Sequence, residues 1–291
     1  MASACTQGLD TGFVALGYAK VAFLGVVQGL TELLPISSTA HMRIVPALLG
    51  WQDPGSAFSA AMQLAALAAV ISYFWSDVRG LLFGSIGAVR RRDFRDWNFR
   101  FAVWIVLATV PIMVAGVLLS PFLNACNSPL RTLTVIGLSC VVMGALLAVA
   151  EYYARHKRTL DQVTLKDALI VGCAQVGALI PGVSRSGSTL TAALFRDLKR
   201  EEAARFSFLL GLPAIAAAGF KELWELHKAH LDAQGWSMLA VGLIVASLSA
   251  FVAIWSLMHI LERYSAWPFV IYRFLLGIVL LVSVAVGFLP N

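Results

Sequence analysis

The chain has 291 residues, of which 59% are hydrophobic and only 13% are charged, with a formal net charge of +6. Soluble domains carry about 25% charged residues, so the composition excludes an ordinary soluble protein and indicates that most of the surface faces lipid. The basic residues lie in short loops between apolar runs, which is typical of membrane topology signals and argues against nucleic-acid binding. We therefore expect a single membrane domain over residues 1–291.

The predicted fold class is an all-α polytopic membrane protein with six transmembrane helices and two re-entrant helical hairpins. In chain order, a broken apolar segment at about 14–49 precedes three continuous runs, and a second broken segment at about 165–195 precedes three more. A spanning helix needs roughly 20 apolar residues. The runs of this kind are Ser56–Tyr73, Phe99–Leu119, Thr132–Ala150, Ala203–Phe220, Trp236–Met258 and Pro268–Leu289.

Each broken segment carries a Gln, a Pro and a Ser-rich turn near its middle. Such backbone is tolerated at membrane depth only where it lines a cavity or packs inside the protein, so both segments are expected to be re-entrant. Basic residues concentrate in loops 76–98, 151–167 and 196–205, which should be cytoplasmic. The first hairpin would then enter from the outer face and the second from the cytoplasm.

The two halves of the chain, about 14–150 and 165–289, resemble each other. The Gly-Val-Val-Gln, Pro and Ser of the first broken segment align with Gly-Cys-Ala-Gln, Pro and Ser of the second, and Ser37 and Ser184 are 147 positions apart. Phe58-Ser59 and Phe206-Ser207 continue the alignment. One hairpin and three spans in each half predict an inverted repeat, which places a site at the midplane where the broken helices meet.

The first hairpin carries a polar motif that ends at His41. Its carboxylate, Glu32, would lie at membrane depth, where an ionisable group is expensive and its default interpretation is functional. A lone serine is more often a helix cap, but Glu32 and His41 in one hairpin favour a site. The other polar residues of the motif are Gln28, which shares a helix face with Glu32, and Ser37, Ser38 and Thr39 in the turn after Pro35.

The second hairpin carries a Gly/Ser turn that opens a helix at Arg185. Backbone N–H groups at a helix N-terminus favour an anion, and a guanidinium group suits phosphate oxygens. Arg185 could also pair with Glu32 as a structural ion pair, and both interpretations can hold together. The remaining candidate phosphate-binding residues in this motif are Gly182, Ser184, Ser186 and Thr189.

If the two turns meet, one pocket contains a carboxylate, an imidazole, several hydroxyls and a guanidinium. This set suits attack on phosphorus, with a nucleophile, a general base and a clamp for developing charge. A transporter of a lipid-linked phosphate is the alternative, because inverted repeats with broken helices are a transporter architecture. A carrier would need Arg185 but has no evident need for Glu32 and His41 together with the serines.

Both motifs resemble the signature motifs of the undecaprenyl-diphosphate phosphatase family, the bacitracin-resistance proteins. The resemblance extends to Phe58, Gln63-Leu64, residues 206–209 and residues 272–275, and so covers nearly the whole chain. It implies hydrolysis of the C55 diphosphate to undecaprenyl phosphate, which recycles the lipid carrier of peptidoglycan synthesis and confers bacitracin resistance. It also implies a bacterial inner-membrane protein, embedded in membrane lipid, whose site opens to the periplasm. A homodimer is left open.

The resemblance makes Glu32 the essential acidic residue, Gln28 its partner and His41 the motif histidine. It assigns the paired serines and the phosphate-binding turn to Ser37, Ser38, Ser184, Arg185 and Thr189. A divalent cation, Mg²⁺ or Ca²⁺, is also implied. Gln28 is a departure, because family members with Glu there have two carboxylates four residues apart, a pair suited to such a cation. Glu32, with Gln28, is therefore expected to hold the cation only together with the substrate diphosphate.

The expected roles follow from this inventory. Arg185 and the backbone of residues 182–186 would hold the diphosphate. Ser38 or a water molecule would attack the terminal phosphorus, with His41 or Glu32 as the base, and the sequence leaves covalent and direct hydrolysis open. Arg273, near the cytoplasmic end of the last span, could bind phosphate or snorkel toward the interface, and snorkelling is the favoured interpretation.

Overall fold

The computed structural model describes residues 11–123, 130, 132–228 and 230–289. Within these ranges the chain is helical, and its extended pairing is limited to one isolated bridge between Arg158 and Leu198. The helices of the first half are α1 (Tyr18–Leu33), α2 (Ser38–Leu48), α3 (Ser56–Ala61), α4 (Gln63–Tyr73), α5 (Trp75–Arg91), α6 (Trp97–Leu123) and α7 (Leu133–Tyr153). Those of the second half are α8 (Leu165–Gln175), α9 (Arg185–Phe195), α10 (Arg200–Lys228), α11 (Ala233–Arg263) and α12 (Trp267–Ala285).

Five of the six predicted spans are confirmed as long apolar helices. Among the described residues, α6, α7, α10, α11 and α12 are long and apolar enough to cross a membrane. The predicted span Ser56–Tyr73 differs, because it is divided into α3 and α4 and then turns by 82° into α5. It becomes a sixth span only if this bent pair is counted as one.

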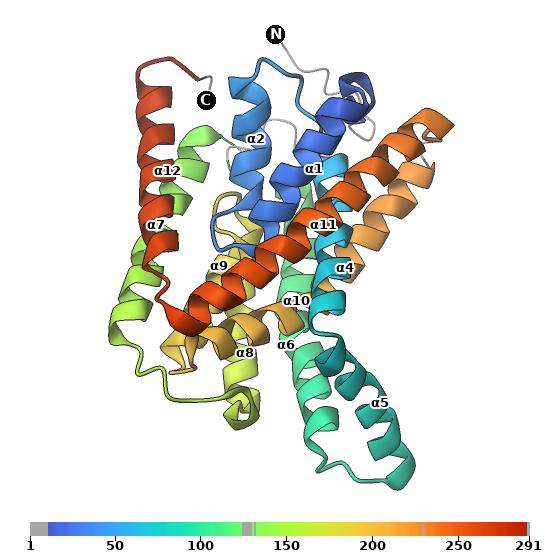
Figure 1. The fold of residues 1–291 in the computed structure, drawn as a ribbon, viewed down its shortest axis with the longest axis vertical. Helices are drawn as coiled ribbons and strands as arrows, with labels where there is room; N and C mark the ends of the chain where they lie inside the picture. Colours follow the sequence, from blue (N-terminus) through green and yellow to red (C-terminus); the bar gives the residue numbers. More distant parts are fainter. Residues whose placement is uncertain (1–10, 124–129, 131, 229, 290–291) are drawn as a thin grey trace.

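The bend between α4 and α5 has a physical cause. Phe74 leaves the helical region of backbone space at the break and is buried, with its ring packed 6.2 Å from that of Phe208 in α10. One turn further on, Asp77 forms an ion pair with Arg205 of α10. Burial of the aromatic ring and pairing of the carboxylate therefore hold the first turn of α5 against α10, and the rest of α5 runs away from the body of the molecule (Figure 1).

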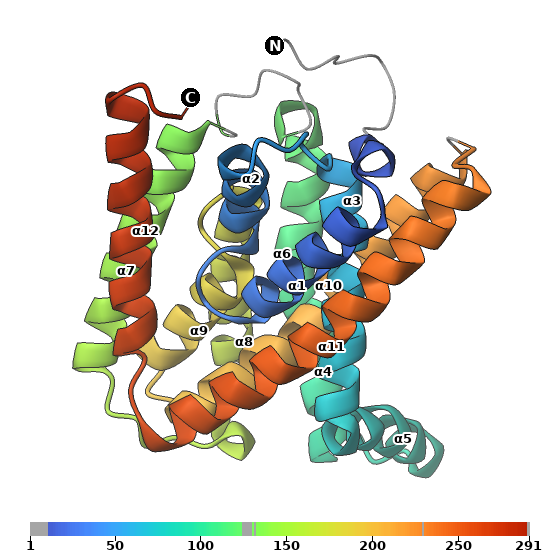
Figure 2. The same ribbon diagram turned by 45° about the horizontal axis from the view of Figure 1, so that its top comes forward.

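The three basic loops gather at one end of the molecule. In Figure 1 the far end of α5, the connection from α7 to α8 and the start of α10 all lie at the lower end, whereas α1 begins and α12 ends toward the upper end. The turn between α1 and α2 lies well inside the molecule in both views (Figures 1 and 2). The loops that are rich in basic residues in the sequence thus lie at one end of the folded molecule.

Helix α1 lies directly against α11, and small residues make this approach possible. A Cβ atom added to Gly29 would lie 2.3 Å from the carbonyl oxygen of Ala246, and one added to Gly25 would lie 2.8 Å from that of Gly242. Both distances are too short for any side chain. Backbone-to-backbone packing through small residues is characteristic of helices in membranes, and here it fixes the helix that carries Gln28 and Glu32.

A buried carboxylate, that of Asp167, lies in the second hairpin at the end of the molecule where the basic loops gather, which we call the basic end. Asp167, in the first turn of α8, has no exposed surface and accepts hydrogen bonds from Arg158 Nη2 at 2.6 Å and from Arg196 Nε at 2.6 Å. Thr164 Oγ1 donates to it at 2.8 Å. Burial alone would raise the pKa of Asp167, but these hydrogen bonds hold it well below its usual range. The ends of α8 and α9 are therefore fastened to the loop after α7.

Asp167→Asn is expected to destabilise the protein by about 3 kcal/mol, because it leaves Arg158 and Arg196 without their counter-charge. A lowered pKa contributes stability above the ordinary Asp pKa of about 3.9, and that contribution disappears as pH falls through the folded-state value. The gap in thermal midpoint between wild type and variant should therefore stay constant from about pH 5 to pH 8 and narrow below about pH 4. Thermal scans in detergent measure this, with the exposed Asp161→Asn as control.

Candidate active site

Two turns of similar geometry bring the predicted motifs together. Helix α1 ends at Leu33 because Pro35 forces Leu34 into an extended conformation. In the turn that follows, Ser37 has φ of 72° and caps α2 by accepting a hydrogen bond from the backbone N–H of Ala40. Ser184 has φ of 68° and caps α9 by accepting one from the N–H of Gly187. The two aligned serines thus start their helices in the same unusual backbone conformation.

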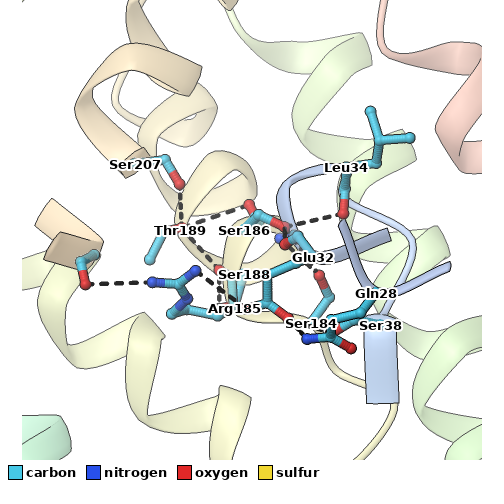
Figure 3. A network of polar contacts seen from close by, with 12 residues as sticks. Gln28, Glu32, Leu34, Ser38, Ser184, Arg185, Ser186, Ser188, Thr189 and Ser207 are labelled. Carbon is cyan, nitrogen blue, oxygen red and sulfur yellow. Dashed lines mark hydrogen bonds and ion pairs between the residues drawn. The ribbon is translucent and has the colours of Figure 1, made fainter. Parts of the chain in front are cut away.

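The carboxylate of Glu32 is the centre of the polar network in Figure 3. Its Oε2 accepts hydrogen bonds from Ser38 Oγ at 2.6 Å and from Gln28 Nε2 at 3.0 Å. Its Oε1 accepts from Arg185 Nη2 at 3.3 Å, across the two turns. The side chains of Glu32 and Arg185 are only 6% and 15% exposed. Four residues named from the sequence therefore lie in one buried network, with the Ser38 proton directed at a carboxylate oxygen.

Hydroxyl groups of the second turn and of α9 form further hydrogen bonds next to the Glu32 network. Ser186 Oγ donates to the carbonyl oxygen of Leu34 at 3.0 Å, which ties α9 to the first turn. Thr189 Oγ1 donates to the carbonyl of Arg185 at 2.8 Å and also contacts Ser207 Oγ of α10. Ser184 Oγ lies 3.2 Å from Ser186 Oγ. Binding of phosphate by these residues and by Gly182 remains a prediction.

His41 is held by a partner that was not assigned a function from the sequence. Its Nδ1 lies 2.7 Å from the carbonyl oxygen of Ser37, so this nitrogen carries the proton, and a neutral ring accepts at Nε2 from the hydroxyl of Tyr272 at 2.5 Å. The ring lies one helical turn beyond Ser38 on α2. Thr39, between them, is exposed, and its hydroxyl lies 3.3 Å from Ser37 Oγ. His41 therefore forms a second polar pair beside the Glu32 network.

The prediction that Arg273 snorkels toward the interface is wrong. Arg273 has no exposed surface, and its guanidinium contacts the carbonyl oxygens of Pro35, Gly182 and Val183 at 2.9–3.0 Å. Helix α12 carries the side chain inward, between the two turns, where backbone carbonyls replace water as hydrogen-bond acceptors. An arginine in an apolar helix looks the same in the sequence whether it faces outward or inward.

Comparison with known proteins agrees with this geometry. The family model described as bacitracin resistance protein BacA matches residues 21–279. The chain belongs to the BacA family. It is 76% identical over 263 residues, 90% of its length and 100% of the relative's, to undecaprenyl-diphosphatase 2 of Mesorhizobium japonicum. It is 49% identical to the undecaprenyl-diphosphatase of Synechococcus elongatus (92% of this chain, 93% of the relative) and 45% to that of Gloeobacter violaceus (95% of each).

The donor set of this BacA-family chain fits a cation that is shared with a ligand. Glu32 and Gln28 both offer oxygen, the ligand atom that Mg²⁺ and Ca²⁺ prefer. Gln28 Oε1 is buried and has no hydrogen-bond partner among the described residues, so it is an available acceptor. The described residues contain no group of three or more His, Cys, Asp or Glu side chains that could hold a metal alone. The remaining ligands would have to come from substrate phosphate or water.

Three residues of the BacA-family site, Tyr272, Arg273 and Ser207, lie in segments that resemble the family, but the sequence does not predict that they contact the two turns. Tyr272 and Arg273 lie in the segment 272–275 that supports the family resemblance, but no polar motif precedes them and α12 reads as an ordinary apolar span. Ser207 likewise belongs to a resembling segment. Their positions follow from packing between distant helices, which a single sequence does not reveal.

Tyr272→Phe is expected to lower kcat about fivefold, because the hydrogen bond to His41 Nε2 is worth about 1 kcal/mol and its loss frees the ring to rotate. The measurement is steady-state phosphate release from a polyprenyl diphosphate. Tyr264→Phe serves as the control, since Tyr264 is exposed at the end of α11. Equal kcat for the two variants would exclude a function for the Tyr272 hydroxyl in orienting His41.

Proposed function

We propose that this chain is an integral membrane phosphatase that hydrolyses undecaprenyl diphosphate to undecaprenyl phosphate and inorganic phosphate. The observation that carries the proposal is the Glu32 network, in which one carboxylate meets a serine hydroxyl and an arginine from opposite turns. The names of the relatives support it, since they are undecaprenyl-diphosphatases covered over almost their full length. Such an enzyme returns the lipid carrier to peptidoglycan synthesis, and the family is associated with bacitracin resistance.

Binding of the diphosphate begins with Arg185. Its contact with Glu32, at 3.3 Å, is long for a charge-assisted bond, so a diphosphate carrying more negative charge than one carboxylate would compete for the guanidinium. Ser184 Oγ accepts from the N–H of Gly187, and the N–H groups that precede Gly187 in the first turn of α9 have no intrahelical acceptors and favour an anion.

The chemical step follows from the Ser38–Glu32 hydrogen bond. The attacking oxygen, either Ser38 Oγ or a water in its place, forms a bond to the terminal phosphorus while its proton passes to Glu32. The bond between that phosphorus and the bridging oxygen breaks, and undecaprenyl phosphate leaves. In the serine route a water then releases inorganic phosphate from Ser38. His41 is engaged at both ring nitrogens, by the Ser37 carbonyl and the Tyr272 hydroxyl, so it would have to release Tyr272 before its Nε2 could exchange a proton with the leaving phosphate.

A divalent cation, Mg²⁺ or Ca²⁺, would be held by Glu32 and Gln28 together with the diphosphate, and it would supply neutralisation of phosphate charge. Gln28→Glu adds a second carboxylate four residues from the first. We expect the cation concentration for half-maximal activity to fall several-fold in this variant, because cation affinity follows the number of charged ligands. Titration of activity with Mg²⁺ and Ca²⁺ measures it, and an unchanged midpoint would place the cation elsewhere.

The architecture that we propose for this function is an inverted repeat of two re-entrant hairpins. The matched caps of α2 and α9 and the constant offset of the motifs support it. The gathering of basic loops at one end supports a cytoplasmic location for that end. The chain would then lie in the bacterial inner membrane with the site open to the periplasm, where the diphosphate group is exposed after carrier use.

The deciding experiment is phosphate release by purified protein from undecaprenyl diphosphate, with Mg²⁺ or Ca²⁺, in water enriched in ¹⁸O. Attack at the terminal phosphorus places the label in inorganic phosphate and leaves undecaprenyl phosphate unlabelled. Acid-quench trapping of phosphoserine at Ser38 would indicate the covalent route. Bound lipid diphosphate without any release, from well-folded protein, would favour a transporter and contradict the proposal.

A further inference from the structure

Arg273 occupies an unusual position for a charged residue. It is the largest fully buried side chain in the described part of the chain, and it comes from α12, far in sequence from both turns. Its Nη1 donates to the carbonyl of Pro35 at 3.0 Å, and its Nη2 donates to the carbonyls of Gly182 and Val183 at 2.9 Å each. The carbonyl of Cys140 in α7 lies 3.5 Å from Nε. One guanidinium therefore contacts both turns and the helix behind them.

Among the residues that the structure describes, the charge of Arg273 has no carboxylate partner. Within the described residues, every carboxylate engaged in an ion pair is paired with another cation, and Glu32 is paired with Arg185. A buried charge satisfied only by carbonyl oxygens is expensive, and an apolar residue of similar volume would fill the space at lower cost. A role in packing alone therefore does not explain an arginine at this position.

The two turns are built around this guanidinium. A Cβ atom on Gly187, in the first turn of α9, would lie 2.7 Å from Arg273 Nη1, so the helix that carries Arg185 rests directly on it. Gly182 has φ of +93°, and a Cβ atom there would lie 2.6 Å from the carbonyl oxygen of Ile136. The turn thus presents its carbonyls to Arg273 in a backbone conformation that glycine adopts readily.

We propose that Arg273 is a positioning residue that holds the Pro35 turn and the Gly182–Val183 turn in register, so that Glu32 and Ser38 face Arg185. The proposal rests on the phosphatase function proposed above. Ser186 provides a second tie, through the carbonyl of Leu34. Arg273 itself donates to backbone oxygens of the turns and acts on the reaction through the placement of the three residues.

Arg273→Lys is the informative substitution, because it keeps the charge but cannot span three carbonyls with a planar fork. A displacement of about 1 Å between reacting groups lowers rate by about 100-fold, so we expect kcat to fall about 100-fold. KM should change by less than about threefold, because Arg185 still contacts the diphosphate. Arg158→Lys is the matched control, since Arg158 also binds carbonyl oxygens, at 2.6 and 2.9 Å, but at the basic end.

A second measurement reports the placement without any turnover. Spin labels at Leu30 and Ile180, which are exposed residues close to the two turns, give the distance between them. Arg273→Lys should broaden or shift this distance distribution, whereas Arg158→Lys should leave it as in wild type. In a double-variant cycle with Ser186→Ala, the combined loss of kcat should differ from the product of the single losses, since both residues hold the same junction.

The outcomes separate cleanly. Unchanged kcat in Arg273→Lys, an unaltered label distance, or single losses that simply multiply would each overturn the proposal. So would a loss of activity that Arg158→Lys reproduces with the same fall in thermal midpoint, because it would indicate general destabilisation. If wild-type protein releases no phosphate, the proposed function fails, and the label distances still test whether Arg273 holds the turns together.

Discussion

Glu32→Gln is expected to lower kcat for phosphate release by about a thousandfold or more, the effect of removing a general base that also orients the attacking group. In the wild-type structure Ser38 Oγ lies 2.6 Å from Glu32 Oε2. Glutamine has nearly the same shape as glutamate but cannot take up the proton of this hydroxyl. The substitution removes the counter-charge of Arg185, which favours diphosphate binding, and also the charge that would hold the cation, which disfavours it. These two effects oppose each other, so KM should change far less than kcat.

The measurement is steady-state kinetics on purified protein in detergent, with binding of the lipid diphosphate followed separately. Glu262→Gln is the matched control, because Glu262 is exposed near the end of α11. A Glu32→Gln variant with wild-type kcat would show that the carboxylate is only a structural partner of Arg185. A variant that loses binding as well as turnover would show that the cation held by Glu32 contributes more to diphosphate binding than the release of Arg185 does.

Arg185→Lys is expected to lower kcat/KM by about 100-fold, and Arg185→Ala by more. Lysine keeps the charge but presents it as a point, so it cannot bind two phosphate oxygens with a planar fork. Unlike the Glu32 variant, both should raise KM, since the guanidinium is the principal cation for the diphosphate.

Kinetics with undecaprenyl diphosphate, and inhibition by inorganic phosphate, measure this difference. Arg155→Lys is a suitable control, because Arg155 is exposed at the basic end. If Arg185→Lys retains wild-type KM and kcat, then charge alone is sufficient and the fork has no function. If binding persists in Arg185→Ala, another cation must hold the phosphate.

The sequence was most informative where polar residues interrupt apolar runs. Glu32 and Arg185 stand out because an ionisable residue at membrane depth is rare, and the structure places them 3.3 Å apart. The Pro and Ser pattern also located both turns, and the ends of the helices at Leu33 and Arg185 follow from proline and serine chemistry. Five long helices follow from hydropathy alone.

What could not be read from the sequence depends on contacts between distant segments. The break at Phe74 needs Phe208 and Arg205 of α10, and hydropathy cannot report a bend fixed by a neighbour. The inward direction of Arg273 depends on α12 facing the turns, and Tyr272 finds His41 at a separation of 231 positions. The amino-acid composition of an apolar helix does not indicate whether a given side chain on it faces lipid or the interior of the protein.

The placement of Arg273 on α12 has a consequence for biogenesis. Glu32 and Ser38 emerge early during translation, whereas α11, against which α1 packs, and the residue that contacts the Pro35 turn are made much later. Until α12 has inserted, the carbonyl of Pro35 lacks the guanidinium that satisfies it, and lipid cannot take the place of that donor. The junction between the two turns is therefore complete only once α12 is in place, and a ribosome-stalled chain that ends before residue 273 should insert its first spans yet remain inactive.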